Sequence, residues 1–144
     1  MEVTNFFSSK KETVTEWNKF SFLYIKHMVI LNSTYQSIIP VKPGHDVTLP
    51  CEVPDGGTVA VVEWIRTDLK DGYVLLYRNK QLDPDYQHQS YRDRVDLQIK
   101  NRNISLILKN VSADDEGTYE CRCRFFQRNS PHQQRSSCYY RIPR

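Results

Sequence analysis

Hydrophobic and polar residues alternate along most of this chain, with the period of two that is typical of β-strands. In residues 45–53, HDVTLPCEV, the side chains of Val47, Leu49, Cys51 and Val53 fall on one face, and most of the residues between them are polar. Further segments of strand-like composition are residues 59–67, 73–79, 94–99, 104–111, 117–125 and 136–142. No apolar stripe with helical spacing is present, so the pattern predicts an all-β protein.

Turn-forming residues separate these segments. Proline fixes φ and glycine supplies positive φ in Pro54-Asp55-Gly56-Gly57, and residues 71–72 and 101–103 interrupt the pattern in a similar way. About seven or eight short strands, with turns every eight to twelve residues, predict a β-sandwich. One short helical turn is expected in residues 111–117, VSADDEG, where Ser112 can cap the turn and the acidic residues favour its N-terminal end.

Composition and charge limit the class of protein. Of the 144 residues 39% are hydrophobic and 12% aromatic, which is enough for one folded domain, and we expect that domain in residues 35–143. A net charge of +3 is too small to favour a nucleic acid partner.

Residues 1–34 are expected to be a degenerate leader or unstructured extension, because the apolar stretch FSFLYIKHMVIL is interrupted by Lys26 and His27. A short helix or strand packed on the domain is the alternative, and any membrane attachment would need an anchor absent from this chain.

Cysteines and glycosylation sequons indicate an oxidising, extracellular compartment. The cysteines are Cys51, Cys121, Cys123 and Cys138, which allow three pairings if all are oxidised. The Asn-x-Ser/Thr sequons begin at Asn32, Asn103 and Asn110.

The residues that could perform chemistry are not arranged for it. A single residue separates Cys121 from Cys123, whereas zinc sites favour two to four, and redox pairs favour Cys-x-x-Cys at the start of a helix. Histidines that could complete a metal site or act as a base fall in segments expected to be leader, turn or loop, and no base is placed beside a nucleophile. We therefore predict no enzymatic activity, no catalytic or metal-binding residues and no cofactor.

Two sets of motifs carry a resemblance to a known family. Asp115-x-Gly117-x-Tyr119-x-Cys121 resembles the signature of variable-type immunoglobulin domains. The segments VTLPC, VEWIRTDLKDGYVLLYRN, SYRDRV and ISLILKNVSADDEGTYEC resemble the membrane-distal domain of the butyrophilin, myelin-oligodendrocyte-glycoprotein and T-cell costimulatory ligand family. The resemblance covers residues 36–142 and implies an immunoglobulin-like β-sandwich of the variable type, with Greek-key antiparallel sheets. The last strand lacks the Gly-x-Gly bulge of antigen-receptor variable domains, so membership of the antigen-receptor family is disfavoured.

The resemblance also implies structural roles. Cys51 and Cys121 would form a disulfide between the sheets, which in the chain-entropy model stabilises the fold by about 4 kcal/mol. An indole would pack on this bond, a tyrosine hydroxyl would reach the backbone at the corner, and an arginine would pair with an aspartate beneath the sandwich. The residues of this core motif are Trp64, Arg94, Asp115, Gly117 and Tyr119.

The remaining two cysteines are predicted to form a second disulfide. Cys123 and Cys138 would lie on neighbouring antiparallel strands and would close the base of a loop spanning residues 124–137, a stabilisation of about 3 kcal/mol. A free thiol and an interchain bond to a partner are the alternatives.

Strand parity and the resemblance together predict a protein-binding surface. If Ala60, Val62 and Trp64 point into the core, the residues between them point outward, and the same holds around Tyr119 and Cys121. The loop at 124–137 matches the third hypervariable position and contains aromatic and arginine residues, the types that dominate interface hot spots. An ordinary solvated loop is the alternative. The predicted partner-binding residues are Val61, Glu63, Ile65, Glu120, Arg122, Arg124, Phe125, Phe126 and Arg128.

These expectations lead to a function as an extracellular recognition module. We expect an immunoglobulin-type ligand or receptor, secreted or on the external side of the plasma membrane, that binds a protein counter-receptor on an immune cell. It would modulate T-cell activation, T-cell receptor signalling and cytokine production. A homophilic adhesion module of the myelin-protein type is the alternative. A third option is sulfated glycan binding, which salt would weaken, through Arg122, Arg124, Arg128 and Arg135.

Overall fold

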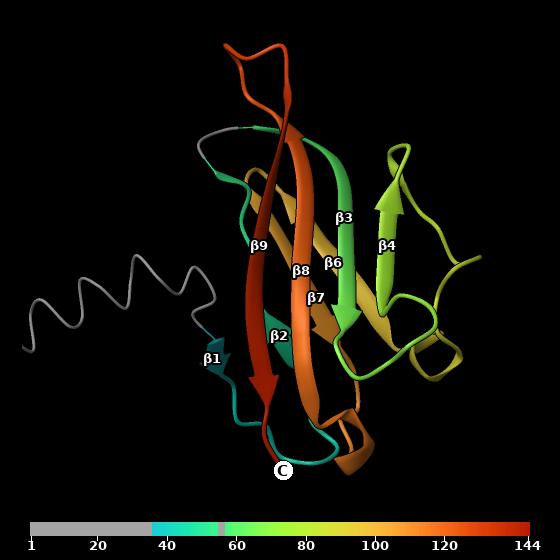
Figure 1. Cartoon of the computed structure of the whole chain (residues 1–144). Coiled ribbons are helices and arrows are strands. Elements are labelled where there is room, and N and C mark those ends of the chain that lie inside the picture. The colour runs from blue at the N-terminus through green and yellow to red at the C-terminus, as the bar shows by residue number, and fades with distance from the viewer. Residues whose placement is uncertain (1–35, 55–56) are drawn as a thin grey trace, which may run out of the picture. The chain divides into compact units, whose positions relative to one another are not determined.

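The computed structural model describes residues 36–54 and 57–144, and these form two packed β-sheets (Figure 1). The larger sheet has the strand order β1-β9-β8-β3-β4-β5, and the smaller sheet has the order β2-β7-β6. The strands are β1 Gln36–Ile38, β2 Val47–Leu49, β3 Thr58–Arg66, β4 Leu75–Arg78, β5 Gln81–Leu82, β6 Val95–Lys100, β7 Asn103–Leu108, β8 Gly117–Phe126 and β9 Gln133–Ile142. Two short 3-10 turns are η2 Gln89–Tyr91 and η3 Ala113–Asp115. The predicted extension at 1–34 and the sequon at Asn32 lie outside the described residues.

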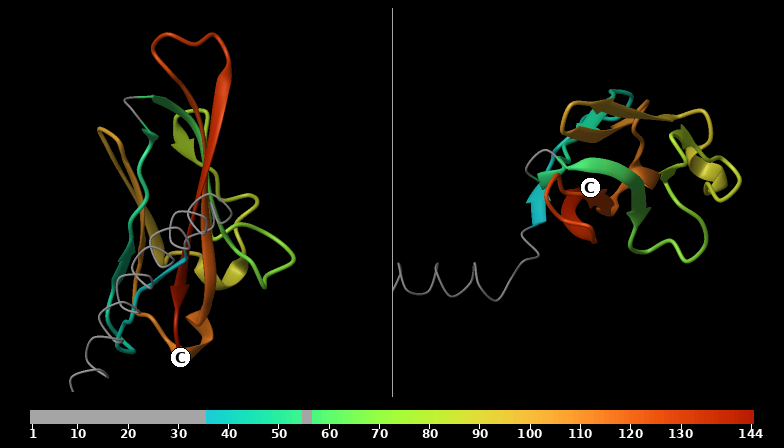
Figure 2. Two further views of the ribbon diagram at one scale, coloured as in Figure 1. Left: turned by 60° about the vertical axis from the view of Figure 1, so that its left-hand side comes forward. Right: turned by 90° about the horizontal axis from the view of Figure 1, so that it is seen from above.

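The predicted all-β sandwich is confirmed. The smaller sheet lies behind β9, β8, β3 and β4, as Figures 1 and 2 show from three directions. Strand β1 runs parallel to β9, whereas the other paired strands of the described ranges are antiparallel. Each strand-like segment of the sequence contains a strand, but β9 begins at Gln133, three residues earlier than expected.

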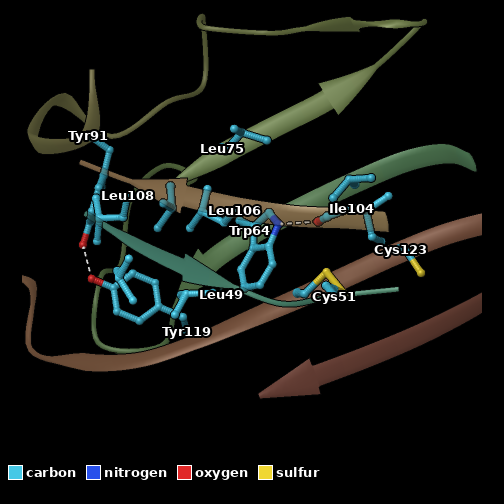
Figure 3. Packing of buried hydrophobic residues seen from close by; sticks show 14 of the residues in the cluster. Leu49, Cys51, Trp64, Leu75, Tyr91, Ile104, Leu106, Leu108, Tyr119 and Cys123 are labelled. Carbon is cyan, nitrogen blue, oxygen red and sulfur yellow. Dashed lines mark hydrogen bonds between the residues drawn. A yellow bond between two sulfur atoms is a disulfide. The ribbon is translucent and has the colours of Figure 1, made fainter. Parts of the chain in front are cut away.

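The core between the sheets is built on the predicted disulfide. Cys51, just after β2, is bonded to Cys121 in β8 across a sequence separation of 70 residues, so this part of the cysteine prediction is confirmed. Trp64 is fully buried beside it, and the indole Nε1 donates a hydrogen bond of 3.2 Å to the carbonyl oxygen of Ile104 in the opposite sheet (Figure 3). The disulfide and the indole thus join the two layers at the centre of the sandwich.

One strand departs from simple alternation. The pairing between β3 and β8 shifts register between Val59 and Val61, which is the mark of a β-bulge. Val62 and Trp64 are fully buried, as predicted, but Val59 rather than Ala60 packs against the core. The prediction for Ala60 was wrong because a bulge inserts one residue and so reverses the parity of the strand beyond it.

The corner below the sandwich contains the predicted ion pair. Arg94 donates two hydrogen bonds to Asp115, of 3.2 Å to Oδ1 and 2.6 Å to Oδ2, and the pairing raises the pKa of Arg94. The carboxylate side chain is only 3% exposed. Ser112 caps η3, and a carboxylate oxygen of Asp115 accepts from the Ser112 amide at 2.9 Å, which completes a capping box.

The tyrosine corner is also confirmed. Tyr119 is fully buried, and its hydroxyl donates to the carbonyl oxygen of Asp115 at 2.7 Å. The hydroxyl of Tyr91, equally buried, lies 3.0 Å from that of Tyr119 (Figure 3). These contacts hold the end of η3 and the start of β8 in one place, and so they set the register in which β8 enters the larger sheet.

Candidate functional site

The outer face of the larger sheet carries a mixed aromatic and charged surface, which we call the front face. Directly opposed residues on antiparallel strands share a face, so the register of β3, β8 and β9 decides which residues belong to it. Of the predicted partner-binding residues, the front face contains Val61, Glu63, Ile65, Glu120, Arg122, Arg124 and Phe126. The structure adds Leu76 and Arg78 from β4, and Arg135, Ser137 and Tyr139 from β9.

Glu120 lies on the front face but is not available to a partner. It is 4% exposed, because Arg122 and Tyr139 cover it. Arg122 donates to both carboxylate oxygens, at 2.7 and 2.9 Å, and the Tyr139 hydroxyl donates at 2.9 Å. Burial alone would raise the pKa of Glu120, but these hydrogen bonds outweigh it and hold the pKa below its ordinary value. Glu120 therefore positions Arg122 and Tyr139, and its prediction as a contact residue is corrected.

Glu63 lies at the centre of the front face. Its Oε1 is 3.4 Å from the hydroxyl of Tyr73 and 3.5 Å from Nη2 of Arg124, and both distances are long for hydrogen bonds. A hollow of about 180 Å³ borders Glu63 on the side of Tyr73 and Tyr86. A second hollow, of about 360 Å³, borders it on the side of β8 and β9. The front face is therefore hollowed on both sides of one acidic side chain.

The hairpin between β8 and β9 is shorter than predicted. Pairing continues through Phe126 opposite Gln133, so the connection contains only residues 127–132, and it projects beyond the sheet in Figure 1. Alternation then separates the two phenylalanines. Phe125 is 3% exposed and packs toward the core, whereas Phe126 is 45% exposed on the front face. Phe125 is therefore a core residue, contrary to prediction, while Arg128 is exposed in the connection.

The predicted Cys123–Cys138 disulfide is wrong in this structure, where both residues are free thiols. Cys138 is directly opposite Cys121 and Cys123 is opposite Ser136, so the two thiols are diagonal neighbours. Diagonal residues are about 7–8 Å apart, farther than the roughly 4.4–6.8 Å between Cα atoms that a disulfide requires. Burial, and then the neighbouring Cys138 thiol, raise the pKa of Cys123 to about 11. Figure 3 shows its sulfur apart from the core disulfide.

The two described sequons differ in their surroundings. Asn110 is exposed after β7 and adopts a positive φ of 49°. Asn103 opens β7 and is partly buried, and its Oδ1 accepts hydrogen bonds from the amide and hydroxyl of Ser105. The Ser105 hydroxyl is itself engaged by the amide of Cys51 at 3.1 Å. Glycosylation at these positions stays a prediction.

Neither a metal centre nor a membrane-spanning helix emerges from the parts of the chain that the structure describes. Within residues 36–54 and 57–144, no three histidine, cysteine or acidic side chains are grouped so that they could hold a metal ion. No helix among these residues has the length and apolar character needed to cross a bilayer.

Some front-face residues were missed by reasoning from the sequence. Arg135, Ser137 and Tyr139 alternate with Cys138 and Tyr140 along the last strand, and this alternation was available as a signal. The last strand was expected to start after Arg135, so Arg135 was assigned to the loop and to the glycan option, and Ser137 and Tyr139 were left without an assigned face. Tyr73 precedes β4, and its hydroxyl lies 3.4 Å from Glu63, a contact that the sequence does not indicate.

Comparisons with known proteins agree with the geometry. The family model of the immunoglobulin V-set domain matches residues 35–137. Butyrophilin subfamily 2 member A2 of Mus musculus is 30% identical over 123 residues, which cover 78% of this chain and 23% of that protein. V-set domain containing T-cell activation inhibitor 1 of Mus musculus is 36% identical over 86 residues, which cover 56% of this chain and 30% of that protein. The chain therefore spans less than a third of the length of these relatives.

A solved structure supports the same fold. The structure of murine CRIg superposes with a TM-score of 0.62 at 18% identity, covering 75% of this chain and 93% of that one. At such low identity the likeness shows the fold alone, and it confirms the predicted variable-type arrangement of strands.

Proposed function

Because this chain belongs to the immunoglobulin V-set family, we propose that it acts as an immune ligand or receptor that binds a protein counter-receptor through its front face. A V-set domain is a binding module, and the chain is not an enzyme. The V-set domain is typical of the extracellular parts of cell-surface immune proteins, and one relative is named as an inhibitor of T-cell activation. The proposal therefore includes an extracellular location and an effect on T-cell activation, T-cell receptor signalling and cytokine production.

The composition of the front face is the observation that carries this proposal. An apolar group, Phe126, is 45% exposed, and partly buried Val61 and Ile65 lie along β3. Charged and aromatic side chains surround them: Glu63, Arg78, Arg122, Arg124, Arg135, Tyr73 and Tyr139. Exposed aromatic residues together with arginine are characteristic of the energetically important centre of protein interfaces.

Rigidity of the face also suits recognition. Most of these side chains stand on strands rather than on a loop, and Arg122 and Tyr139 are held by the buried carboxylate of Glu120. Binding of a partner therefore costs less side-chain entropy at the front face than it would at a surface of unrestrained side chains.

The test measures the binding of fluorescently labelled tetramers of the purified chain to resting and activated lymphocytes. Ile65→Asp and Phe126→Asp should each abolish staining, because each places an unpaired charge in the interface. Ile107→Asp is a matched control, since Ile107 is a partly buried isoleucine on the outer face of the smaller sheet. Thermal melts must show that all three variants remain folded.

The outcomes separate the alternatives. Staining that survives both front-face substitutions would reject the front face as the binding surface. Absence of staining on any lymphocyte, combined with reversible self-association in sedimentation experiments, would instead favour homophilic adhesion.

A further inference from the structure

Two arginines of the front face oppose each other directly. Arg124 in β8 is paired with Arg135 in β9, and the alternation of both strands places their side chains on the same face. Like charges in this arrangement destabilise a sheet. The pair therefore lowers the stability of the fold unless an anion lies between the two guanidinium groups.

The neighbouring acids do not fully compensate this pair. Glu63 approaches Arg124 only to 3.5 Å, and Arg135 forms no ion pair within residues 36–54 and 57–144. Glu120 does not compensate the pair, because Arg122 engages both of its carboxylate oxygens. Three guanidinium groups and two carboxylates thus leave one positive charge in excess in this part of the front face.

The excess charge borders an open hollow. The hollow of about 360 Å³ is lined by Arg122, Arg124, Arg135, Glu63, Ser136 and Ser137, and we call it the arginine notch. It is large enough for a carboxylate group, and arginine is the side chain best suited to bind carboxylate in a bidentate geometry.

We propose that the arginine notch binds the carboxylate of an aspartate or glutamate side chain presented by the protein partner. This inference rests on the proposed function, because it names the chemistry by which the front face recognises its counter-receptor. The partner's acidic side chain would supply the negative charge that the Arg124–Arg135 pair lacks, and the aromatic and apolar residues around the notch would exclude water from the contact.

A single carboxylate fits the charges better than a polyanion does. Arg122 is neutralised by Glu120 at 2.7 Å, and Arg78 is neutralised by Asp83 at 2.6 Å. A sulfated glycan needs a continuous row of unpaired basic groups, and these two ion pairs interrupt that row.

A second copy of the chain is also disfavoured at the notch. In a symmetric dimer the same patch contacts itself, so a two-fold axis at the notch would bring Arg124 and Arg135 against the same residues of the other copy. Such a contact would place like charges together at the centre of the interface, which opposes association.

The experiment uses the full 144-residue chain, and the probe is an N-acetylated, C-amidated Gly-Glu-Gly peptide, which carries a single carboxylate. The side-chain Nε–Hε signals of Arg124 and Arg135 are followed by NMR during the titration, and a heparin fragment is titrated in parallel. Arg135→Gln should weaken peptide binding about tenfold, the effect of losing one charge-assisted contact. Arg128→Gln is the matched control, because Arg128 carries the same charge in the exposed hairpin connection, and it should change binding less than about twofold.

Thermal unfolding without peptide adds a second readout. Arg135→Gln should melt at or above the temperature of the original chain, because it removes a like-charge repulsion. A lower melting temperature would show that Arg135 is structural and would overturn the proposal. Equal weakening of peptide binding by Arg128→Gln would also overturn it, as would binding of heparin without binding of the peptide.

The two proposals can fail separately. If lymphocyte staining is lost in Ile65→Asp but retained in Arg135→Gln, the front face is the binding surface and the arginine notch is refuted. If the peptide saturates the notch and no lymphocyte stains, the anion site is supported while the immune counter-receptor is not.

Discussion

Replacing Tyr119 with phenylalanine removes one buried hydroxyl group and leaves the aromatic ring in place. That hydroxyl donates its proton to the carbonyl oxygen of Asp115, so the Tyr91 hydroxyl must be the donor in the 3.0 Å contact between the two tyrosines. The oxygen of Tyr91 in turn accepts from Nη1 of Arg66 at 2.9 Å. The donors therefore follow one direction, from the guanidinium through both phenols to the backbone carbonyl.

This direction predicts unequal costs for the two isosteric substitutions. Tyr119→Phe breaks two hydrogen bonds, worth about 1 kcal/mol each, and leaves the Asp115 carbonyl without this donor, so we expect a loss of about 3 kcal/mol. Tyr91→Phe also breaks two bonds, but the Tyr119 hydroxyl keeps its acceptor and Arg66 keeps other partners, so about 2 kcal/mol is expected. The double variant should lose about 1 kcal/mol less than the sum, because the two substitutions share one bond.

Urea denaturation, followed by the fluorescence of buried Trp64 and by circular dichroism, measures these free energies of unfolding. Tyr86→Phe serves as the control, because Tyr86 is 56% exposed and its hydroxyl deletion should cost less than about 0.5 kcal/mol. Equal losses in Tyr119→Phe and Tyr91→Phe would refute the assigned direction of donation. Strict additivity in the double variant would refute the hydrogen bond between the two hydroxyls.

Three further predictions concern the thiols, an acid of the front face and the ion pair at the corner. Mass spectrometry without reduction should recover Cys123 and Cys138 unbonded, and a linked peptide pair would contradict this. Because burial raises the pKa of Cys123 to about 11, its alkylation near pH 8 should be much slower in the native chain than after unfolding. Hydrogen bonds hold the pKa of Glu120 below its ordinary value of 4.5, so the stability that they contribute is complete above pH 4.5 and is lost as the pH falls through the lowered pKa. Urea titrations near pH 7 and pH 3 should therefore show a smaller acid-induced loss of unfolding free energy in Glu120→Gln than in the original chain, and an equal loss would contradict this prediction. Arg94→Ala should lower the free energy of unfolding, measured by thermal denaturation, by about 3–5 kcal/mol, because it leaves the buried carboxylate of Asp115 unpaired. Replacing the exposed Arg92 with alanine should change it by less than about 0.5 kcal/mol, and similar losses in the two variants would show that the Arg94–Asp115 pair is not effectively buried.

Much of the scaffold could be predicted because its signals are local. The spacing of Asp115, Gly117, Tyr119 and Cys121 places a turn, a corner and a disulfide within a few residues, and the structure contains all three. Alternation along Val62 and its neighbours in β3 correctly separated core from surface for most of that strand. These features follow from backbone geometry, since successive side chains on a strand point to opposite faces.

The errors arose where pairing between strands decides the outcome. The expected loop from 124 to 137 is mostly hairpin, because ten successive residues of β8 pair with β9. That pairing places Phe125 in the core, sets Cys123 and Cys138 diagonally, and brings Arg124 opposite Arg135. None of these relations can be derived from one strand alone, because a shift of one residue in register exchanges the two faces.

Availability of a side chain is a separate matter from its direction. Glu120 points outward as predicted, yet Arg122 and Tyr139 cover it and occupy its oxygens. Arg122 lies on the same strand, two residues from Glu120, but Tyr139 comes from β9, and its place opposite Glu120 depends on the pairing of the two strands.

The sequence by itself therefore determined the β-sandwich through its periodicity, and its family through motifs of fixed spacing. The Cys51–Cys121 bond and the Arg94–Asp115 pair followed from the resemblance to that family. Only the tertiary structure decided the composition of the front face, the reduced state of Cys123 and the opposition of Arg124 and Arg135. The physical reason is that hydrogen bonding between strands, with a β-bulge in one of them, sets a register that no single segment encodes.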